Sequence, residues 1–180
     1  MIMRRSVLIV LLVFMLSSLA GAQPVSLEKA REMYYSMTSD NCHSLKLAES
    51  FEKNKPSQPL LKAYYGASAA AAPECVTNPA TKISWFRKGK SLLDEAVKAD
   101  PSNFEIRFLR FATQDKAPGF LGYNDNINED KKFILSNLAK GKGAVNNPKV
   151  FKEITGFLLK SDNLDQKEKK IVNDYLNTTK

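Results

Sequence analysis

Apolar residues recur along most of this chain at the spacing of one helix face, and three Asn-Pro or Asp-Pro pairs interrupt the pattern. An Asn or Asp side chain accepts a hydrogen bond from the free amides of a first helical turn. Proline fits the next position because its missing N–H would have no intrahelical partner there. The pairs therefore predict that helices begin at Asn78-Pro79, Asp100-Pro101 and Asn147-Pro148.

Apolar residues at helical spacing follow each of these pairs. The first group predicts a helix that runs to about Ala99. The second group covers so much of the helix surface that we expect this helix to be central in the fold. The three groups are Ile83, Phe86, Leu93, Ala96 and Val97; Phe104, Phe108 and Phe111, widened by Ile106, Leu109 and Ala112; and Val150, Phe151, Ile154, Phe157 and Leu158.

Weaker signals predict five more helices. Ser26 can cap the first helix of the chain, Ser57 with Pro59 opens the third, and Gly141 is expected to end the sixth as a left-handed C-terminal cap. No stretch alternates with a period of two for long enough to predict a strand, so the expected fold class is all-α. The apolar residues that mark these five helices are Leu27, Ala30, Tyr34 and Met37; Leu45, Ala48 and Phe51; Leu60, Tyr64, Ala67 and Ala71; Ile127, Ile134 and Leu138; and Leu164, Ile171 and Tyr175.

Residues 115–125 form the longest stretch without a helical pattern. Pro118 and two glycines prevent regular structure in it. Phe120, Leu121 and Tyr123 are too apolar for a free linker. We therefore expect this segment to fold back on the core.

The first 22 residues have the layout of a secretory signal peptide. Arg4 and Arg5 give a basic start, an unbroken apolar run follows, and small residues at Ala20 and Ala22 suit signal peptidase. The apolar run is shorter than the roughly 20 residues that a membrane-spanning helix needs. We expect cleavage before Gln23 and export of residues 23–180 to a periplasmic or extracellular location.

The expected mature chain has the size of one domain with its own core. The full sequence contains 27 lysines and arginines and 19 acidic residues, so loss of Arg4 and Arg5 leaves a formal charge of +6. The basic residues form no arginine-rich tract with interleaved aromatics, and export argues against a nucleic-acid partner. Weak contact with an anionic membrane surface fits this charge.

Cys42 and Cys75 both remain after cleavage. In an oxidising compartment an even pair predicts a disulfide, and two buried thiols are the alternative. A bond between them would close a loop of about 33 residues and contribute roughly 3 to 4 kcal/mol to stability.

Two segments resemble the tetratricopeptide repeat. Residues 64–70, Tyr-Tyr-Gly-Ala-Ser-Ala-Ala, have the aromatic-then-small character of a first repeat helix. Residues 93–103 resemble the end of a second one, with Leu93, Ala96 and Pro101 at the motif's spacing. The small residues would let paired helices approach closely, and the proline would start the helix of the next repeat.

This resemblance, to a divergent tetratricopeptide-like exported bacterial protein, implies an antiparallel helix-turn-helix array in an α-α superhelix. Residues 73–84 depart from the family's pattern, because they form an insertion where the motif has a short turn. A compact helical bundle is the alternative architecture.

Catalytic and metal-binding patterns are weak in this sequence. His43 adjoins Cys42, but with Cys75 they are too few for a zinc site, and Ser39 stands where a haem motif has a second cysteine. Residues 124–130 lack the glycine and glutamate of a calcium loop, so helix capping explains their acids and amides better. We expect no cofactor, no metal and no enzymatic activity.

Four residues are candidates for contact with a partner. Arg107, Arg110 and Gln114 lie at i, i+3 and i+7 on the most apolar helix, and we expect them to face solvent or a groove together with Tyr65. Arginine binds a carboxylate with two parallel hydrogen bonds, which lysine cannot do. Replacing both arginines by lysine is therefore expected to weaken partner binding and barely to change thermal stability.

A second candidate surface is basic. Residues 131–152 contain six lysines and no acidic residue, a composition that suits an anionic membrane or glycan but is also typical of a solvated face. The lysines are Lys131, Lys132, Lys140, Lys142, Lys149 and Lys152.

Two functions from different classes fit the sequence. The first is an exported helical scaffold that binds a protein or peptide of the cell envelope through a groove. The second is a carrier of a small molecule or lipid that uses a cavity inside a helical bundle.

Overall fold

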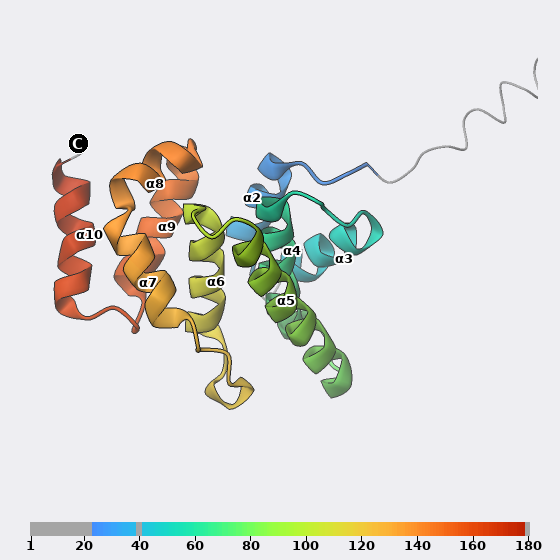
Figure 1. Ribbon diagram of the computed structural model, residues 1–180. Coiled ribbons are helices and arrows are strands. Elements are labelled where there is room, and N and C mark those ends of the chain that lie inside the picture. The colour runs from blue at the N-terminus through green and yellow to red at the C-terminus, as the bar shows by residue number, and fades with distance from the viewer. Residues whose placement is uncertain (1–22, 39–40, 179–180) are drawn as a thin grey trace, which may run out of the picture.

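The computed structural model describes residues 23–38 and 41–178, so the expected signal peptide lies outside the described residues. In the described ranges the chain forms nine α-helices and two short 3-10 turns and no β-strand, which confirms the all-α class (Figure 1). The elements are α2 Leu27–Tyr35, α3 His43–Lys53, α4 Pro59–Ala71, η1 Ala72–Cys75, α5 Pro79–Ala99, α6 Phe104–Lys116, η2 Gly119–Leu121, α7 Ile127–Ser136, α8 Leu138–Val145, α9 Pro148–Lys160 and α10 Gln166–Thr178.

Three of the expected helix starts are confirmed by their caps. The side chains of Ser26, Asn78 and Asn147 each accept a hydrogen bond from the backbone N–H three residues further on, at 3.2, 3.0 and 3.1 Å. In the second and third of these helices proline occupies the first position, as the sequence predicts.

One expected start and one expected cap are wrong. Asp100-Pro101 lies in a turn, and α6 begins at Phe104 with Asn103 as its cap, which accepts from the Ile106 N–H at 3.1 Å. Asp100 instead ends α5, and its carboxylate accepts a hydrogen bond from the Asn103 amide. The residue before α4 is Gln58 rather than Ser57, and its side chain makes no capping bond.

The expected role of Gly141 is also wrong. The helical pattern breaks earlier, at Asn137, whose side chain donates to the Phe133 carbonyl at 2.8 Å and so separates α7 from α8. Gly141 lies inside α8, and Asn146 adopts the left-handed conformation that ends this helix. A Cβ on Gly141 would lie 2.5 Å from two ring carbons of Phe104, so glycine allows α8 to approach α6 closely.

The core consists of two clusters of buried side chains that share α6. Ile106 and Leu109 belong to the cluster formed with α2 to α5, whereas Phe104, Phe108 and Phe111 belong to the cluster formed with α7 to α10. Figure 1 shows the same order in space, with α6 between the two groups of helices. The prediction that α6 is central is therefore confirmed.

A buried ion pair connects α2 to α6. Nε of Arg31 donates to Oε1 of Glu105 at 2.9 Å, and Nη2 donates to the Val145 carbonyl, at the end of α8, at 3.1 Å. The Tyr64 hydroxyl of α4 also donates to Glu105. The hydrogen bond to Glu105 is the largest cause that raises the pKa of Arg31, so this guanidinium group stays charged. These contacts link both groups of helices through α6.

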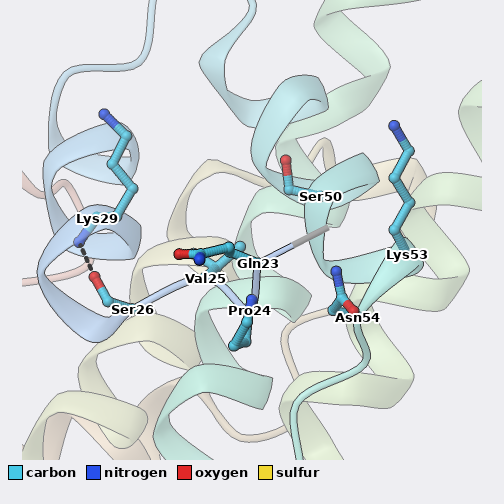
Figure 2. Close-up of a pocket in the computed structure, with 8 residues that line it drawn as sticks. All are labelled: Gln23, Pro24, Val25, Ser26, Lys29, Ser50, Lys53 and Asn54. Carbon is cyan, nitrogen blue, oxygen red and sulfur yellow. Dashed lines mark hydrogen bonds between the residues drawn. The ribbon is translucent and has the colours of Figure 1, made fainter. Parts of the chain in front are cut away.

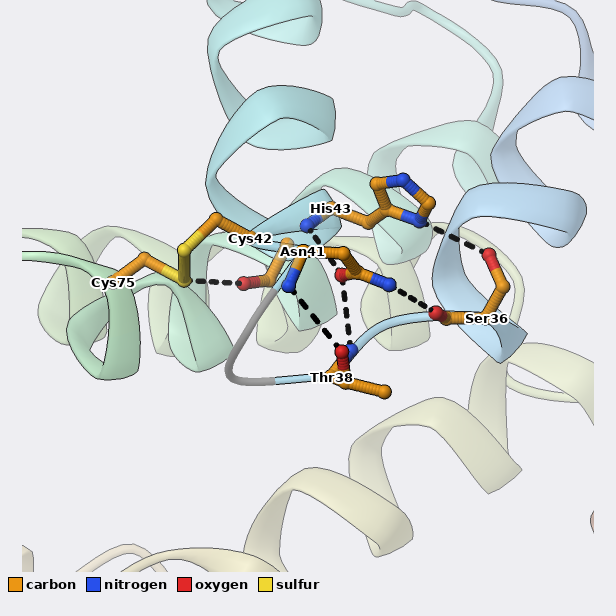
Figure 3. Close-up of a disulfide and its surroundings, with 7 residues drawn as sticks. Ser36, Thr38, Asn41, Cys42, His43 and Cys75 are labelled. Carbon is orange, nitrogen blue, oxygen red and sulfur yellow. Dashed lines mark hydrogen bonds between the residues drawn. A yellow bond between two sulfur atoms is a disulfide. The ribbon is translucent and has the colours of Figure 1, made fainter.

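The expected disulfide joins Cys42 to Cys75, whose Cα atoms are 5.7 Å apart. Cys42 precedes α3 and Cys75 ends η1, so the bond links the start of α3 to the end of the α4–η1 segment (Figure 3). His43 lies at the first position of α3, with Nδ1 3.1 Å from the Ser36 hydroxyl. A disulfide is compatible with an oxidising, exported location.

No helix within the described ranges is both long and apolar enough to cross a membrane.

Candidate functional site

The face of α6 that was expected to meet a partner is buried. Arg107 and Arg110 are 5% and 6% exposed, and Gln114 is buried beside them. The prediction that these three side chains face solvent or a groove is therefore wrong. Helix α7 and the segment before it cover this face, because the turn at η2 brings the chain back across α6.

Asp130 of α7 is the group that holds the two arginines. Nε of Arg110 donates to Oδ2 of Asp130 at 2.7 Å, and Nη2 donates to Oδ1 at 2.9 Å. Nε of Arg107 lies 2.6 Å from Oδ1 of the same carboxylate. Asp130 is completely buried. One carboxylate therefore binds two guanidinium groups inside the protein.

The sequence pattern indicated helix capping for Asp130, and its role as the shared partner of the two arginines was not predicted. Burial raises the pKa of Asp130 above its ordinary value, while the hydrogen bond from Arg110 and the charges of both arginines act in the opposite direction. Two more acidic groups lie at the margin of the cluster: Glu129 is 2.8 Å from Nη2 of Arg107, and Asp94 is 3.6 Å from Nη1 of Arg110. Charge is thus nearly balanced without any external anion.

Tyr123 brings the segment between α6 and α7 onto this cluster. Its ring packs edge-on against Phe86 of α5, with centroids 6.0 Å apart, and its hydroxyl donates to Asp94 at 3.2 Å. Burial raises the pKa of Tyr123, with a further contribution from Asp94. A contribution from the Gln114 amide acts in the opposite direction and lowers this pKa. Residues 115–125 therefore fold back on the core at Tyr123, as expected.

Tyr65 is likewise buried and lies away from the arginines. Its hydroxyl donates to Glu52 of α3, and its ring packs against Phe51. Lys88 of α5 donates to the same carboxylate at 2.8 Å and lowers the pKa of Glu52. Tyr65 thus belongs to a contact between α3, α4 and α5, and the structure does not bring it together with Arg107 and Arg110.

The six lysines of the basic segment have two different environments. Nζ of Lys131 donates to the Asn163 carbonyl at 2.8 Å and lies 3.0 Å from a carboxylate oxygen of Glu168, so it connects α7 to the start of α10. The other five are exposed and are distributed over three helices: Lys132 on α7, Lys140 and Lys142 on α8, and Lys149 and Lys152 on α9.

Phe120 belongs to the segment that was expected to fold back on the core, but its own side chain is exposed. It is 88% exposed at the tip of η2. The turn itself is well held: the Leu121 N–H donates to the Pro118 carbonyl at 2.9 Å, and the Gly122 N–H donates to Gly119 at 3.1 Å. Gly122 has φ 58°, a conformation that glycine adopts easily. Phe120 is therefore presented on an ordered turn.

Ile83 is a second exposed apolar residue, although it belongs to the apolar stripe that predicted α5. It lies in the first half of α5 and is 45% exposed. Helix α5 has 21 residues and its antiparallel neighbour α4 has 13, so residues 79–84 extend past α4 and are all exposed. Figure 1 shows that this half of α5 and the turn between α6 and α7 lie at the same end of the molecule. We call Ile83 and Phe120 together the apolar end.

Two shallow hollows flank the segment that precedes α2. One, of about 420 Å³, is bordered by residues 23–26, by Lys29 and by Lys53 with its neighbours at the end of α3 (Figure 2). The other, of about 490 Å³, lies between Pro24 and residues 54–58. Both are open to solvent, and polar side chains form much of their borders.

The described part of the chain contains no group of three or more His, Cys, Asp or Glu side chains placed to hold a metal ion. Comparison of the sequence with protein-family models and with curated proteins, and of the structure with solved structures, gave no match.

Proposed function

We propose that this chain is an exported helical scaffold, without catalytic activity, that binds a protein or peptide of the cell envelope through the apolar end. The observation that carries the proposal is the exposure of Phe120 on an ordered turn. Burial of a Phe side chain contributes roughly 1.5 to 3 kcal/mol of favourable free energy, and the isolated chain does not gain it at Phe120. Exposed aromatic residues held in place are typical anchors of protein interfaces.

Charged groups beside Ile83 give this end the composition of an interface. Lys82 and Arg87 are exposed on the same half of α5, and the chain has no acidic residue from Val76 to Leu93. An apolar centre with a charged margin is the usual arrangement in complexes that form and dissociate. The arginines of α6 no longer belong to the proposed binding surface, because their guanidinium groups are already bound by Asp130.

A tetratricopeptide-like arrangement remains our proposal for the architecture. Helices α4 and α5 support it, since they form the most extensive helix pair and approach through small residues. A Cβ on Gly89 would lie 2.5 Å from the Gly66 carbonyl and 2.4 Å from the Ala70 nitrogen. Pro101 departs from the motif because it lies in a turn rather than in a helix.

The carrier alternative requires an enclosed apolar cavity. The two hollows described above are open and have charged or polar side chains at their borders, which favours the scaffold.

Capture experiments with the mature protein test this proposal. The immobilised protein is incubated with solubilised native envelope, and retained proteins are identified by mass spectrometry. Phe120→Asp should reduce the retained partner at least tenfold without lowering the melting temperature. Ile171→Asp is the matched control, because Ile171 is 47% exposed on α10, remote from the apolar end (Figure 1).

Equal loss of the partner with both variants would show that general surface hydrophobicity, and not the apolar end, is responsible. Retention of the partner by Phe120→Asp at the level of the unmodified protein would exclude this end as the binding surface.

A further inference from the structure

Gln23 becomes the N-terminal residue if the leader is removed after Ala22. We infer that the mature N-terminus is a site of modification, where Gln23 is converted to pyroglutamate. The α-amine nitrogen attacks Cδ of the Gln23 side chain, a bond forms between them, the Cδ–Nε2 bond breaks, and ammonia leaves. The reaction is internal to one residue and needs no oxidant or reductant. It rests on the proposed export and cleavage.

The chain is held in place immediately after Gln23, whereas Gln23 itself is exposed to solvent. Val25 packs against the core cluster formed with α2 to α5. Ser26 caps α2 by accepting a hydrogen bond from the Lys29 N–H at 3.2 Å. Gln23 and Pro24 are both exposed in front of this fixed point. An acyltransferase of the glutaminyl cyclase class, which acts on an N-terminal glutamine, can therefore reach Gln23 without unfolding of α2.

The surroundings of Gln23 favour the uncharged product. The hollow beside it is bordered by two cationic side chains, Lys29 and Lys53, and by no carboxylate (Figure 2). Lys29 has its own partner outside this border, since its Nζ lies 3.0 Å from Glu32. A free α-ammonium group on Gln23 would add a third positive charge here, and the lactam removes it. Solvent screens the repulsion between the α-ammonium group and the two lysines, so its removal is only a small contribution in favour of the modification.

Ring size makes the reaction specific to glutamine. Closure of Gln23 gives a five-membered lactam, whereas asparagine at the same position would need a strained four-membered ring. The lactam has no free α-amine, which is the group that aminopeptidases bind. We expect the modification to protect the segment before α2 from trimming.

The test is the intact mass of the exported protein. The full-length chain is produced with its leader in a bacterial host that has a periplasmic glutaminyl cyclase, purified from the envelope, and measured without proteolytic digestion. The expected mass is that of residues 23–180 with one disulfide, reduced by roughly 17 Da for the lost ammonia. An amine-specific reagent should label less than a tenth of the N-termini. Gln23→Asn is the control, and it should keep its full mass and a reactive α-amine.

Other results would overturn the inference in distinguishable ways. A chain that begins at Gln23 with unreduced mass and a reactive α-amine would leave export and cleavage intact and exclude the modification. A chain that begins at another residue would exclude both the cleavage position and the modification. Loss of Gln23 together with Pro24 would likewise exclude the modification, because the residue that carries it would be removed.

Discussion

Arg110 on α6 and Asp130 on α7 form a two-pronged ion pair inside the protein, with Nε to Oδ2 at 2.7 Å and Nη2 to Oδ1 at 2.9 Å. Arg107 shares the same carboxylate. Two positive charges thus share one completely buried negative charge. Removal of one partner from a buried ion pair is costly because it leaves an uncompensated charge in a poorly solvated place.

Asp130→Asn should therefore destabilise the fold strongly. Asparagine has nearly the same shape, but it leaves Arg107 and Arg110 without their shared counter-charge. We expect the free energy of unfolding to fall by about 3 to 5 kcal/mol. Urea unfolding followed by circular dichroism measures this change. Asp125→Asn is the control, since Asp125 is exposed five residues earlier and should change stability by about 0.5 kcal/mol or less. A similarly small effect of Asp130→Asn would contradict the structural role.

Arg110→Lys should lower the free energy of unfolding by about 1 to 3 kcal/mol, because one ammonium group cannot replace both hydrogen bonds to Asp130. The sequence alone predicted little change in thermal stability for the lysine variants. The structure reverses that expectation. Differential scanning calorimetry of Arg110→Lys distinguishes the expectation from the structure from the expectation from the sequence. An unchanged melting temperature would favour the expectation from the sequence.

The disulfide should contribute substantially to stability. Because it closes a segment with a sequence separation of 33, chain-entropy arguments predict that Cys42→Ser with Cys75→Ser lowers the free energy of unfolding by about 3 to 4 kcal/mol. Labelling of thiols in denaturant without reductant should find none in the exported protein. Detection of two reactive thiols per chain would contradict the bond.

Two glycines of α8 should respond in opposite directions to alanine. A Cβ on Gly141 would lie 2.5 Å from the Phe104 ring, so Gly141→Ala should cost about 1 to 3 kcal/mol as the helices separate. A Cβ on Gly143 would meet nothing within 4 Å. Gly143→Ala should therefore stabilise the helix by up to about 1 kcal/mol, the usual gain in helix propensity. Paired chemical denaturation of the two variants tests this, and a loss of stability in both would contradict it.

Local signals in the sequence were sufficient for most helices. Ser26, Asn78 and Asn147 cap their own helices through bonds that span three residues, so the sequence near each start contains the whole cause. Asp100-Pro101 failed because Asn103, three residues later, competes for the same role. Gly141 failed because its cause is a contact with Phe104, which is distant in sequence.

The candidate site was harder to predict for the same reason. Helical periodicity placed Arg107 and Arg110 off the apolar stripe correctly, but it contains no information about what covers that face. Asp130 is 20 residues from Arg110 and reaches it only after the chain turns at η2. A surplus of arginines on an otherwise apolar helix followed by an acid-rich segment was the available signal. The fold-back of residues 115–125 was predicted, but the sequence did not show which apolar side chains turn inward: Leu121 and Tyr123 do, and Phe120 does not.

Asp115 should make stability depend on pH in the acid range. Its carboxylate, at the end of α6, accepts hydrogen bonds from Ser161 and from Asn163, the latter at 2.9 Å, and lies 3.1 Å from Nζ of Lys116. Burial acts to raise the pKa of Asp115, but these hydrogen bonds and the charge of Lys116 outweigh it and hold the pKa below the ordinary value of 3.8.

The folded chain therefore binds this proton less readily than the unfolded chain. The stabilisation from Asp115 is complete above the ordinary pKa and is lost as the pH falls through the lower pKa of the folded state. We expect Asp115→Asn to lower the free energy of unfolding by about 1.5 to 3 kcal/mol at pH 7, the range for hydrogen bonds to a charged group. The difference between the variant and the unmodified protein should shrink progressively below about pH 4. Urea titrations at several pH values measure this difference. Asp162→Asn is the control, because Asp162 is exposed and lies between Ser161 and Asn163. A difference that stays constant down to about pH 2 would show that shape, and not charge, accounts for the role of Asp115.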